Sequence, residues 1–138
     1  MSEQALKQVL FVCIGNTCRS PMAEGFANLY GSDVLRASSA GLSPVDKVAL
    51  ATVATMQEKN VDISAHVPRP YDPAIVSRYD LVVNMSGFKL PGAPPKLLQD
   101  WVITDPFRSS PAVYRAVRDE LERRVMQLIL HLRRKPKA

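Results

Sequence analysis

The sequence predicts a single α/β domain of three layers, in which a parallel β-sheet lies between helices. The first observation is that short apolar, β-branched runs alternate with segments of helical periodicity along the 138 residues, a pattern typical of parallel sheets covered on both faces. The second is a polar, glycine-containing loop directly after the first apolar run. Ligands of such sheets bind beyond the carboxyl ends of the strands, so this loop is the expected place for a site.

The first two elements are defined by their ends. Gln8–Cys13 is a short apolar run that stops at a loop, which predicts a buried strand. Ser20 and Pro21 supply an N-cap and a first-turn proline for a helix that runs to about Tyr30. The later elements expected are a strand at Asp33–Ser38, a helix at Asp46–Asn60, a strand at Tyr79–Met85, a fourth strand at Trp101–Ile103 and a helix at Pro111–Arg134.

Both later helices carry apolar residues at helical spacing, and the final one carries a continuous stripe. That stripe predicts a long helix packed on the sheet, whereas the proline-rich segment Lys89–Lys96 predicts a loop. The apolar positions of the earlier helix are Val48, Leu50, Ala51, Ala54 and Met56. Those of the final helix are Tyr114, Val117, Leu121, Val125, Leu128 and Leu132.

Length and composition indicate one domain over residues 1–138, with frayed tails at 1–7 and 135–138. The sequence shows no signal peptide and no membrane span, so we expect a cytoplasmic protein. Its two cysteines give neither a disulfide framework nor a zinc site. The net charge of +5 owes much to basic residues between Arg115 and Lys137, which we interpret as a solvated helix face rather than a nucleic-acid site.

The loop after the first strand combines a possible nucleophile with groups that bind anions. Cys13 ends the strand, Arg19 follows six residues later, and a helix begins directly afterwards. Backbone N–H groups, a helix N-terminus and a guanidinium would converge on one point above the sulfur. Such surroundings favour a thiolate and suit the two oxygens that an arginine fork binds on a phosphate. The loop therefore predicts a cysteine enzyme that acts on phosphate esters.

Three more residues of the loop have expected roles. Gly15 and Asn16 tolerate positive φ, which helps successive N–H groups point inward as an anion nest. The Ser20 hydroxyl could cap the helix, donate a hydrogen bond to the Cys13 sulfur, or do both.

A thiolate nucleophile needs an acid for the leaving group. Asp105 is the first candidate, because the proline that follows holds it in an extended loop. It would protonate the leaving atom and then act as base toward the hydrolytic water. His66 is the alternative acid, although it could equally be structural or support the loop.

These residues resemble a known family. Cys13-Ile-Gly-Asn-Thr-Cys-Arg-Ser-Pro-Met-Ala-Glu24 is similar to the signature loop of the low-molecular-weight protein tyrosine phosphatases, and Asp105-Pro-Phe107 to their acid loop. Three further segments resemble the family: Ser38-Ser-Ala-Gly41, Ile63-Ser-Ala-His66 and Tyr79-Asp-Leu-Val-Val-Asn-Met85. The resemblance implies a four-stranded parallel sheet and catalysis without metal or cofactor.

The resemblance also implies residue roles. Cys13 would be the nucleophile, Arg19 the phosphate ligand and Asp105 the acid. Asn16, Ser39 and His66 match a hydrogen-bonded brace beneath the loop, and Cys18 matches a second cysteine that can form a protective disulfide with the nucleophile. Phosphate or substrate would contact Ile14, Gly15, Asn16, Thr17, Cys18, Arg19, Ser20 and Phe107.

Several substrates stay open. Phosphotyrosine on proteins comes first, with Phe107 flanking its ring and Ile14 and Val45 opposite, while Arg108 stands where many tyrosine-specific members have a second aromatic residue. Thr17 resembles the threonine of arginine phosphatases, so phosphoarginine is the alternative. Arsenate reduction ranks lower because no cysteine follows Cys18, and a redox or phosphate-binding module without turnover ranks lower still. We expect a monomer that takes phosphorylated proteins and releases inorganic phosphate.

Overall fold

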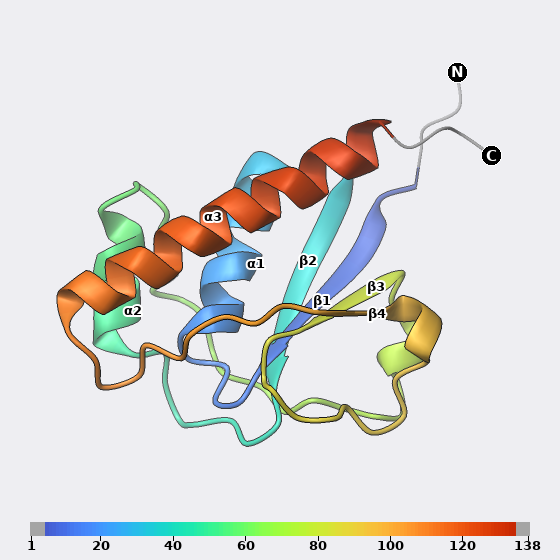
Figure 1. Cartoon of the computed structure of the whole chain (residues 1–138), viewed down its shortest axis with the longest axis horizontal. Helices are drawn as coiled ribbons and strands as arrows, with labels where there is room; N and C mark the ends of the chain where they lie inside the picture. The colour runs from blue at the N-terminus through green and yellow to red at the C-terminus, as the bar shows by residue number, and fades with distance from the viewer. Residues whose placement is uncertain (1–4, 135–138) are drawn as a thin grey trace.

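The computed structural model describes residues 5–134 and consists of one parallel sheet with helices packed on it (Figure 1). The four strands lie in the order β2-β1-β3-β4 and every neighbouring pair is parallel. The predicted α/β class and four-stranded parallel sheet are therefore confirmed. The elements are β1 (Lys7–Cys13), α1 (Arg19–Tyr30), β2 (Leu35–Gly41), α2 (Leu50–Gln57), β3 (Leu81–Asn84), β4 (Leu98–Asp100) and α3 (Pro111–Arg134), with 3-10 helices η1 (Val76–Arg78) and η2 (Pro95–Leu97).

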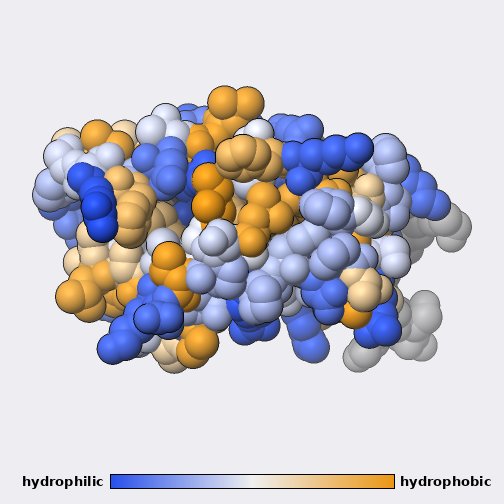
Figure 2. Space-filling model, turned by 90° about the horizontal axis from the view of Figure 1, so that it is seen from below, coloured by the Kyte–Doolittle hydropathy of each residue, from blue (hydrophilic) through white to orange (hydrophobic). Residues whose placement is uncertain are grey.

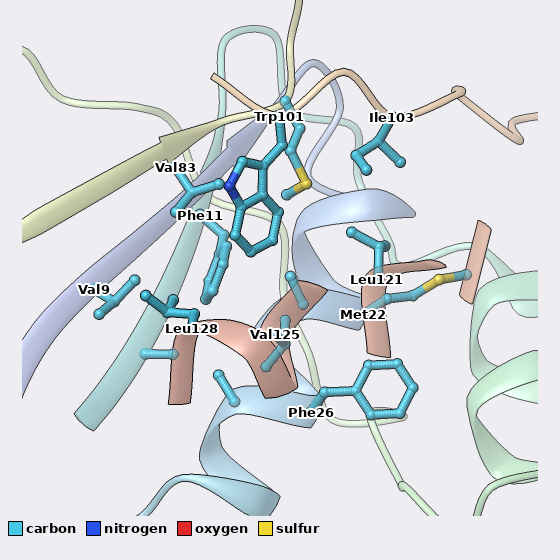
Figure 3. Close-up of a cluster of buried hydrophobic side chains, with 14 of the residues drawn as sticks. Val9, Phe11, Met22, Phe26, Val83, Trp101, Ile103, Leu121, Val125 and Leu128 are labelled. Atoms are coloured by element: carbon cyan, nitrogen blue, oxygen red, sulfur yellow. The ribbon is translucent and has the colours of Figure 1, made fainter. Parts of the chain in front are cut away.

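Alternate residues of β1 face two separate cores. Val9 and Phe11 belong to the larger core, which also takes the buried residues of α1, α2 and α3 (Figure 3). Leu10 and Val12 belong to a smaller core beneath η1 and its neighbouring loops. The strand is buried on both sides, as its unbroken apolar sequence predicts. The second face is thus covered by a 3-10 helix and loops, while all three α-helices pack on the first.

The two predicted helix faces have different outcomes. All six stripe positions of α3 pack into or against the larger core, so that prediction is confirmed. Helix α2 is shorter than predicted and Leu50 is 87% exposed. Of the other predicted positions, Met56 is buried and Val48 packs against the larger core, whereas Ala51 and Ala54 are exposed. Thr52 and Thr55 are also buried and were not predicted. Residues 46–49 do not join the helix, because the Lys47 carbonyl and the Ala49 N–H bond to Thr17 in the loop after β1.

Other boundaries also shift. The fourth strand is Leu98–Asp100 rather than Trp101–Ile103, because β3 ends at Asn84, whose carbonyl accepts the last bond from the Trp101 N–H at 2.9 Å. The strands β2 and β3 lie within two to three residues of the predicted bounds. β1 begins at Lys7, inside the predicted tail, while residues 1–4 and 135–138 lie outside the described part. Between residues 5 and 134, no helix is both long and apolar enough to cross a bilayer.

An ion-pair cluster joins α2 to α3. The buried Arg118 donates to the Thr55 carbonyl at 3.0 Å and to Glu58 at 2.7 Å, and Arg115 donates to the same carboxylate at 2.9 Å. The hydrogen bonds from Arg115 and then from Arg118 lower the pKa of Glu58 from 4.5 to about 2. A carboxylate with a lowered pKa stabilises the folded state above its unfolded pKa and loses that contribution as pH falls.

We expect Glu58→Gln to lower the melting temperature at pH 6, to have a smaller effect at pH 3 and to have little effect at pH 2. The reason is that the contribution of Glu58 declines below its unfolded pKa of about 4.5 and is lost only as pH falls through its folded pKa of about 2. Thermal melts of both proteins between pH 7 and pH 2 measure the difference. Asp46→Asn is the matched control, since no ion pair of Asp46 occurs among the described residues. A difference that stays constant over this range would contradict the prediction.

Candidate active site

The loop between β1 and α1 is held by hydrogen bonds to its outward-facing carbonyl groups. Residues 42–49 run beside it, and four of them donate their N–H groups to it. The bonds run from Leu42 to the Cys13 carbonyl at 3.1 Å, from Ser43 to Ile14 at 2.8 Å, from Val45 to Gly15 at 3.1 Å and from Ala49 to Thr17 at 3.4 Å. The Asn16 carbonyl accepts from Nε2 of His66 at 3.0 Å. Every carbonyl from Cys13 to Thr17 is therefore occupied.

The N–H groups of the same loop are left for a ligand. No backbone N–H from Ile14 to Cys18 donates to an acceptor within the described chain. Asn16 has a φ of 53°, which confirms one of the two predicted positive values, whereas Gly15 is not among the positive-φ residues. At Gly15, an added Cβ would lie 3.3 Å from Cγ2 of Thr17. A side chain at position 15 would therefore be in tight contact with Thr17. The free N–H groups give the loop the form of an anion nest.

The Cys13 thiol lies under this nest at the end of β1 and is buried. Its sulfur is 2.9 Å from the Ser20 hydroxyl oxygen. Ser20 is the second residue of α1 and makes no cap, because the helix begins at Arg19 with Cys18 in the capping position and no side-chain cap bond. Of the two roles considered for Ser20, the structure supports only the contact with the sulfur.

A hydrogen-bonded chain sets the direction of that contact. The Asn16 amide nitrogen donates to Ser20 at 2.8 Å and to Ser39 at 2.9 Å, and Ser39 in turn donates to the Glu24 carboxylate. A carboxylate only accepts, so each hydroxyl receives from Asn16 and passes its own hydrogen on. The Ser20 hydrogen is therefore directed at the Cys13 sulfur, where it would stabilise a thiolate.

Glu24 was not predicted, because its role depends on contacts with residues distant in sequence. It begins the hydrogen-bonded chain at Ser39 and lies 3.9 Å from Nδ1 of His66. The contacts of His66 do not suit a general acid, since its other ring nitrogen donates to the Asn16 carbonyl. Of the alternatives for His66, support of the loop fits the contacts.

We expect Glu24→Leu to lower kcat for a phosphate ester about tenfold with little change in KM, because the Ser20 hydroxyl loses its fixed direction. Glu24→Gln keeps an acceptor oxygen for Ser39 and should restore most of the activity. Steady-state kinetics of the three proteins measure this. Equal losses in both variants, or a loss confined to KM, would contradict the orienting role.

Arg19 is the first residue of α1 and its side chain is almost wholly buried. One terminal nitrogen donates to the carbonyls of Met85 and Ile103, the latter at 3.2 Å. Its Nε is buried without a hydrogen-bond partner in the described chain. A buried donor without a partner is costly unless a ligand satisfies it, so the guanidinium is fixed by the backbone and retains donor capacity for an anion.

Asp105 stands on the loop that follows β4, next to Arg19. Its Oδ2 lies 3.7 Å from a terminal nitrogen of Arg19, and its Oδ1 accepts from the Phe107 N–H at 3.1 Å. The carboxyl group remains about half exposed. Phe107 is also exposed, and the Arg108 guanidinium lies 5.3 Å from its ring centroid. Arg108 thus places a cation at the position where many tyrosine-specific members of the family have a second aromatic residue.

Most of the predicted site residues meet in one pocket of about 170 Å³, whereas Asn16 and Ser20, also predicted to contact phosphate, are not among its lining. The predicted nucleophile Cys13, phosphate ligand Arg19 and acid Asp105 all line it, together with the apolar residues Ile14, Val45 and Phe107. Ser43 also lines it and was not predicted. The complete lining is Cys13, Ile14, Gly15, Thr17, Cys18, Arg19, Ser43, Val45, Asp105 and Phe107. The brace residues Asn16, Ser39 and His66 lie outside the lining.

Two loop side chains are occupied by the protein itself. The Thr17 hydroxyl donates to the Lys47 carbonyl at 2.9 Å, so its hydrogen serves the adjoining segment. The Cys18 sulfur lies 3.6 Å from the Tyr114 hydroxyl. Burial raises the pKa of the Cys18 thiol above its usual range, and burial together with Cys18 raises the pKa of Tyr114 to about 12. Cys18 is therefore a weakly ionised thiol.

A buried thiol beneath converging N–H groups, with a fixed guanidinium and a carboxyl group at its mouth, defines a class of cysteine enzymes that act on tetrahedral oxyanions. In residues 5–134, no three His, Cys, Asp or Glu side chains are grouped to hold a metal ion. The chain belongs to the low molecular weight phosphotyrosine protein phosphatase family, whose model matches residues 8–138. This family contains phosphatases and arsenate reductases.

Two relatives that are similar to this chain are named arsenate reductases. A glutaredoxin arsenate reductase of Synechocystis sp. is 36% identical over 129 residues, covering 90% of this chain and 97% of the relative. An arsenate reductase of Bacillus subtilis is 34% identical over 131 residues, covering 88% and 94%.

Among solved structures, both an arsenate reductase and a protein tyrosine phosphatase are similar to this chain. An arsenate reductase in the phosphate binding state superposes with a TM-score of 0.80 at 34% identity, covering 92% of this chain and 99% of that one. A protein tyrosine phosphatase superposes with a TM-score of 0.84 at 25% identity, covering 94% and 97%.

Proposed function

We propose that this chain is a phosphoprotein phosphatase that hydrolyses phosphotyrosine through a cysteinyl-phosphate intermediate. The observation that carries the proposal is the pocket in which Cys13, Arg19 and Asp105 share one opening with three apolar side chains. Ile14, Val45 and Phe107 suit the faces of a phenyl ring. The proposal includes a cytoplasmic location and release of inorganic phosphate.

The reaction would have two steps. In the first, the Cys13 sulfur attacks phosphorus and forms the S–P bond, the P–O bond to the leaving group breaks, and Asp105 gives its proton to the departing oxygen. In the second, Asp105 takes a proton from water, the water oxygen attacks phosphorus, and the S–P bond breaks. The electron pair returns to sulfur, toward which the Ser20 hydroxyl donates.

Phosphoarginine, in which a P–N bond would break instead of a P–O bond, remains the alternative substrate, based on Thr17. Because the Thr17 hydroxyl hydrogen is bonded to the Lys47 carbonyl, only its oxygen lone pairs are available to a polar leaving group or to water. An arginine leaving group offers N–H donors, so the Thr17 oxygen can still accept from it and phosphoarginine stays a close alternative. The three apolar side chains that suit a phenyl ring keep phosphotyrosine in the first place.

Arsenate reduction is the second candidate function, and the names of the relatives favour it. Cys13 sulfur would displace hydroxide from arsenate, and an external thiol would then attack that sulfur. Arsenite would leave with the electron pair of the S–As bond, and a second thiol would reduce the mixed disulfide. The chain has only two cysteines, and Cys18 is buried with a raised pKa. The reductant would therefore be external, and the name of one relative suggests a glutaredoxin.

One preparation can decide between the two functions. We would measure turnover of three substrates by the parent, Asp105→Asn and Cys18→Ser. The substrates are a phosphotyrosine peptide, a phosphoarginine peptide, and arsenate with glutaredoxin and glutathione. We expect phosphotyrosine hydrolysis to have the highest kcat/KM and to fall about 10²-fold or more in Asp105→Asn. Thiol-dependent arsenite formation without peptide hydrolysis would establish the second candidate instead.

A further inference from the structure

A second hollow, of about 460 Å³, adjoins the catalytic pocket. Arg19 lines both, so one guanidinium separates the phosphate loop from this hollow. The hollow is formed by the turn after β3 and by the strand-like segment before Asp105. Phe88 comes from the turn and Val102 from the segment.

These two side chains are large, apolar and open to solvent. Phe88 is 63% exposed and Val102 is 88% exposed. Both follow the carboxyl ends of their strands, at the edge of the sheet that carries the catalytic loop. Figure 2 views the molecule from that edge, where hydrophobic residues gather near the middle of the face. Apolar surface gathered beside a site indicates binding.

The backbone that presents Phe88 is firmly held. The Asn84 amide nitrogen donates to the Phe88 carbonyl at 2.7 Å, and the Asn84 amide oxygen accepts from the Ser86 hydroxyl at 2.6 Å. The Phe88 N–H donates to the Ser86 oxygen at 3.1 Å. Gly87 supplies the positive φ of 79° that the turn requires. A rigid turn that exposes a phenyl ring loses little entropy when that ring binds a partner.

The segment that presents Val102 is held at both neighbours. The Trp101 N–H donates to the Asn84 carbonyl at 2.9 Å, and the Ile103 carbonyl accepts from Arg19 at 3.2 Å. Asn84 thus joins the two walls of the hollow, and Arg19 joins one wall to the phosphate site. The hollow and the catalytic pocket thus share Arg19, and hydrogen bonds hold both walls of the hollow.

We propose that this hollow, between Phe88 and Val102, binds an apolar side chain next to the phosphorylated residue of a protein substrate. The inference rests on the phosphatase function proposed above. The catalytic pocket, at about 170 Å³, has room for the phosphorylated side chain alone. The flanking residues of any chain that brings its phosphate to Arg19 must pass beside that pocket. Lys89 and Asp100 also line the hollow with opposite charges, so charge favours neither acidic nor basic neighbours.

The test compares phosphotyrosine peptides that differ only by leucine or serine at each of the three positions before and after the phosphotyrosine. For the parent, we expect one leucine position to raise kcat/KM about tenfold, the size of effect that an apolar pocket gives. Phe88→Ser with Val102→Ser should remove this preference and leave p-nitrophenyl phosphate turnover unchanged. Val67→Ser, also an exposed valine, should behave as the parent.

Three results would contradict the proposed docking surface. The first is that leucine is not preferred at any position, and the second is that the preference survives in the double variant. The third is that the double variant changes only self-association, measured by light scattering. The last would make this face an interface between copies. If the parent fails to hydrolyse p-nitrophenyl phosphate under reducing conditions, the phosphatase function itself fails, which is a different outcome from hydrolysis without peptide preference.

Discussion

Arg19→Lys is expected to lower kcat/KM for a phosphate ester by about 10³-fold or more. The guanidinium donates to Met85 and Ile103 with one nitrogen and leaves Nε unpaired beside the anion nest. Lysine keeps the charge but has neither the fork nor the backbone contacts that fix its plane. Loss of a single fixed donor in an oxyanion site costs about 10²–10³-fold, and here at least two are lost.

Because Arg19 is buried, the variant must be shown to be folded. Its melting temperature and its circular dichroism spectrum are measured with its kinetics on p-nitrophenyl phosphate. Arg36→Lys, on the exposed side of β2, is the matched control and should retain full activity. A folded Arg19→Lys within tenfold of the parent would show that charge alone suffices at this position.

Gly41→Ala is expected to lower kcat/KM about 10²-fold. Gly41 ends β2 beside the catalytic loop, where an added Cβ would lie 2.6 Å from the Ile14 carbonyl oxygen and 2.9 Å from the Asn16 nitrogen. Both atoms are backbone and can yield only if the loop moves. Displacement of about 1 Å in a catalytic constellation can cost about 10²-fold.

A control for this glycine lies elsewhere in the chain. At Gly31, which follows α1, an added Cβ would lie 2.7 Å from the Ile129 side chain. Gly31→Ala should therefore lower the melting temperature while kcat/KM at 15 °C stays near that of the parent. If Gly41→Ala lost only stability and kept its turnover, the loop would tolerate displacement and the close approach would have no catalytic role.

Cys13 and Arg19 could be predicted from residue type and spacing, because they lie on one loop. Asp105 was a candidate because of the proline after it, and the resemblance to the family added Ser39 and His66. Glu24, Gly41 and Ser43 were not predicted because each acts through a contact between distant segments. A glutamate on a helix and a glycine at a strand end look ordinary until the fold brings the loop to them.

The elements of the fold also differ in how far the sequence alone predicts them. The strand β1 and the stripe of α3 follow from hydrophobic pattern, which burial enforces. The start of α2 could not be predicted, because residues 46–49 have a helical pattern but hydrogen-bond to a loop some thirty residues earlier. The position of β4 depends on where β3 ends, a pairing that a single sequence does not contain.

The outward carbonyls of the catalytic loop make it dependent on the rest of the molecule. Four of them are satisfied by residues 42–49 and one by His66. The eight residues from Cys13 to Ser20 therefore could not be grafted onto another α/β protein as a working unit. The smallest transferable module would have to include the end of β2, the segment that follows it and a donor in the place of His66, so the site can be redesigned only as three pieces of chain together.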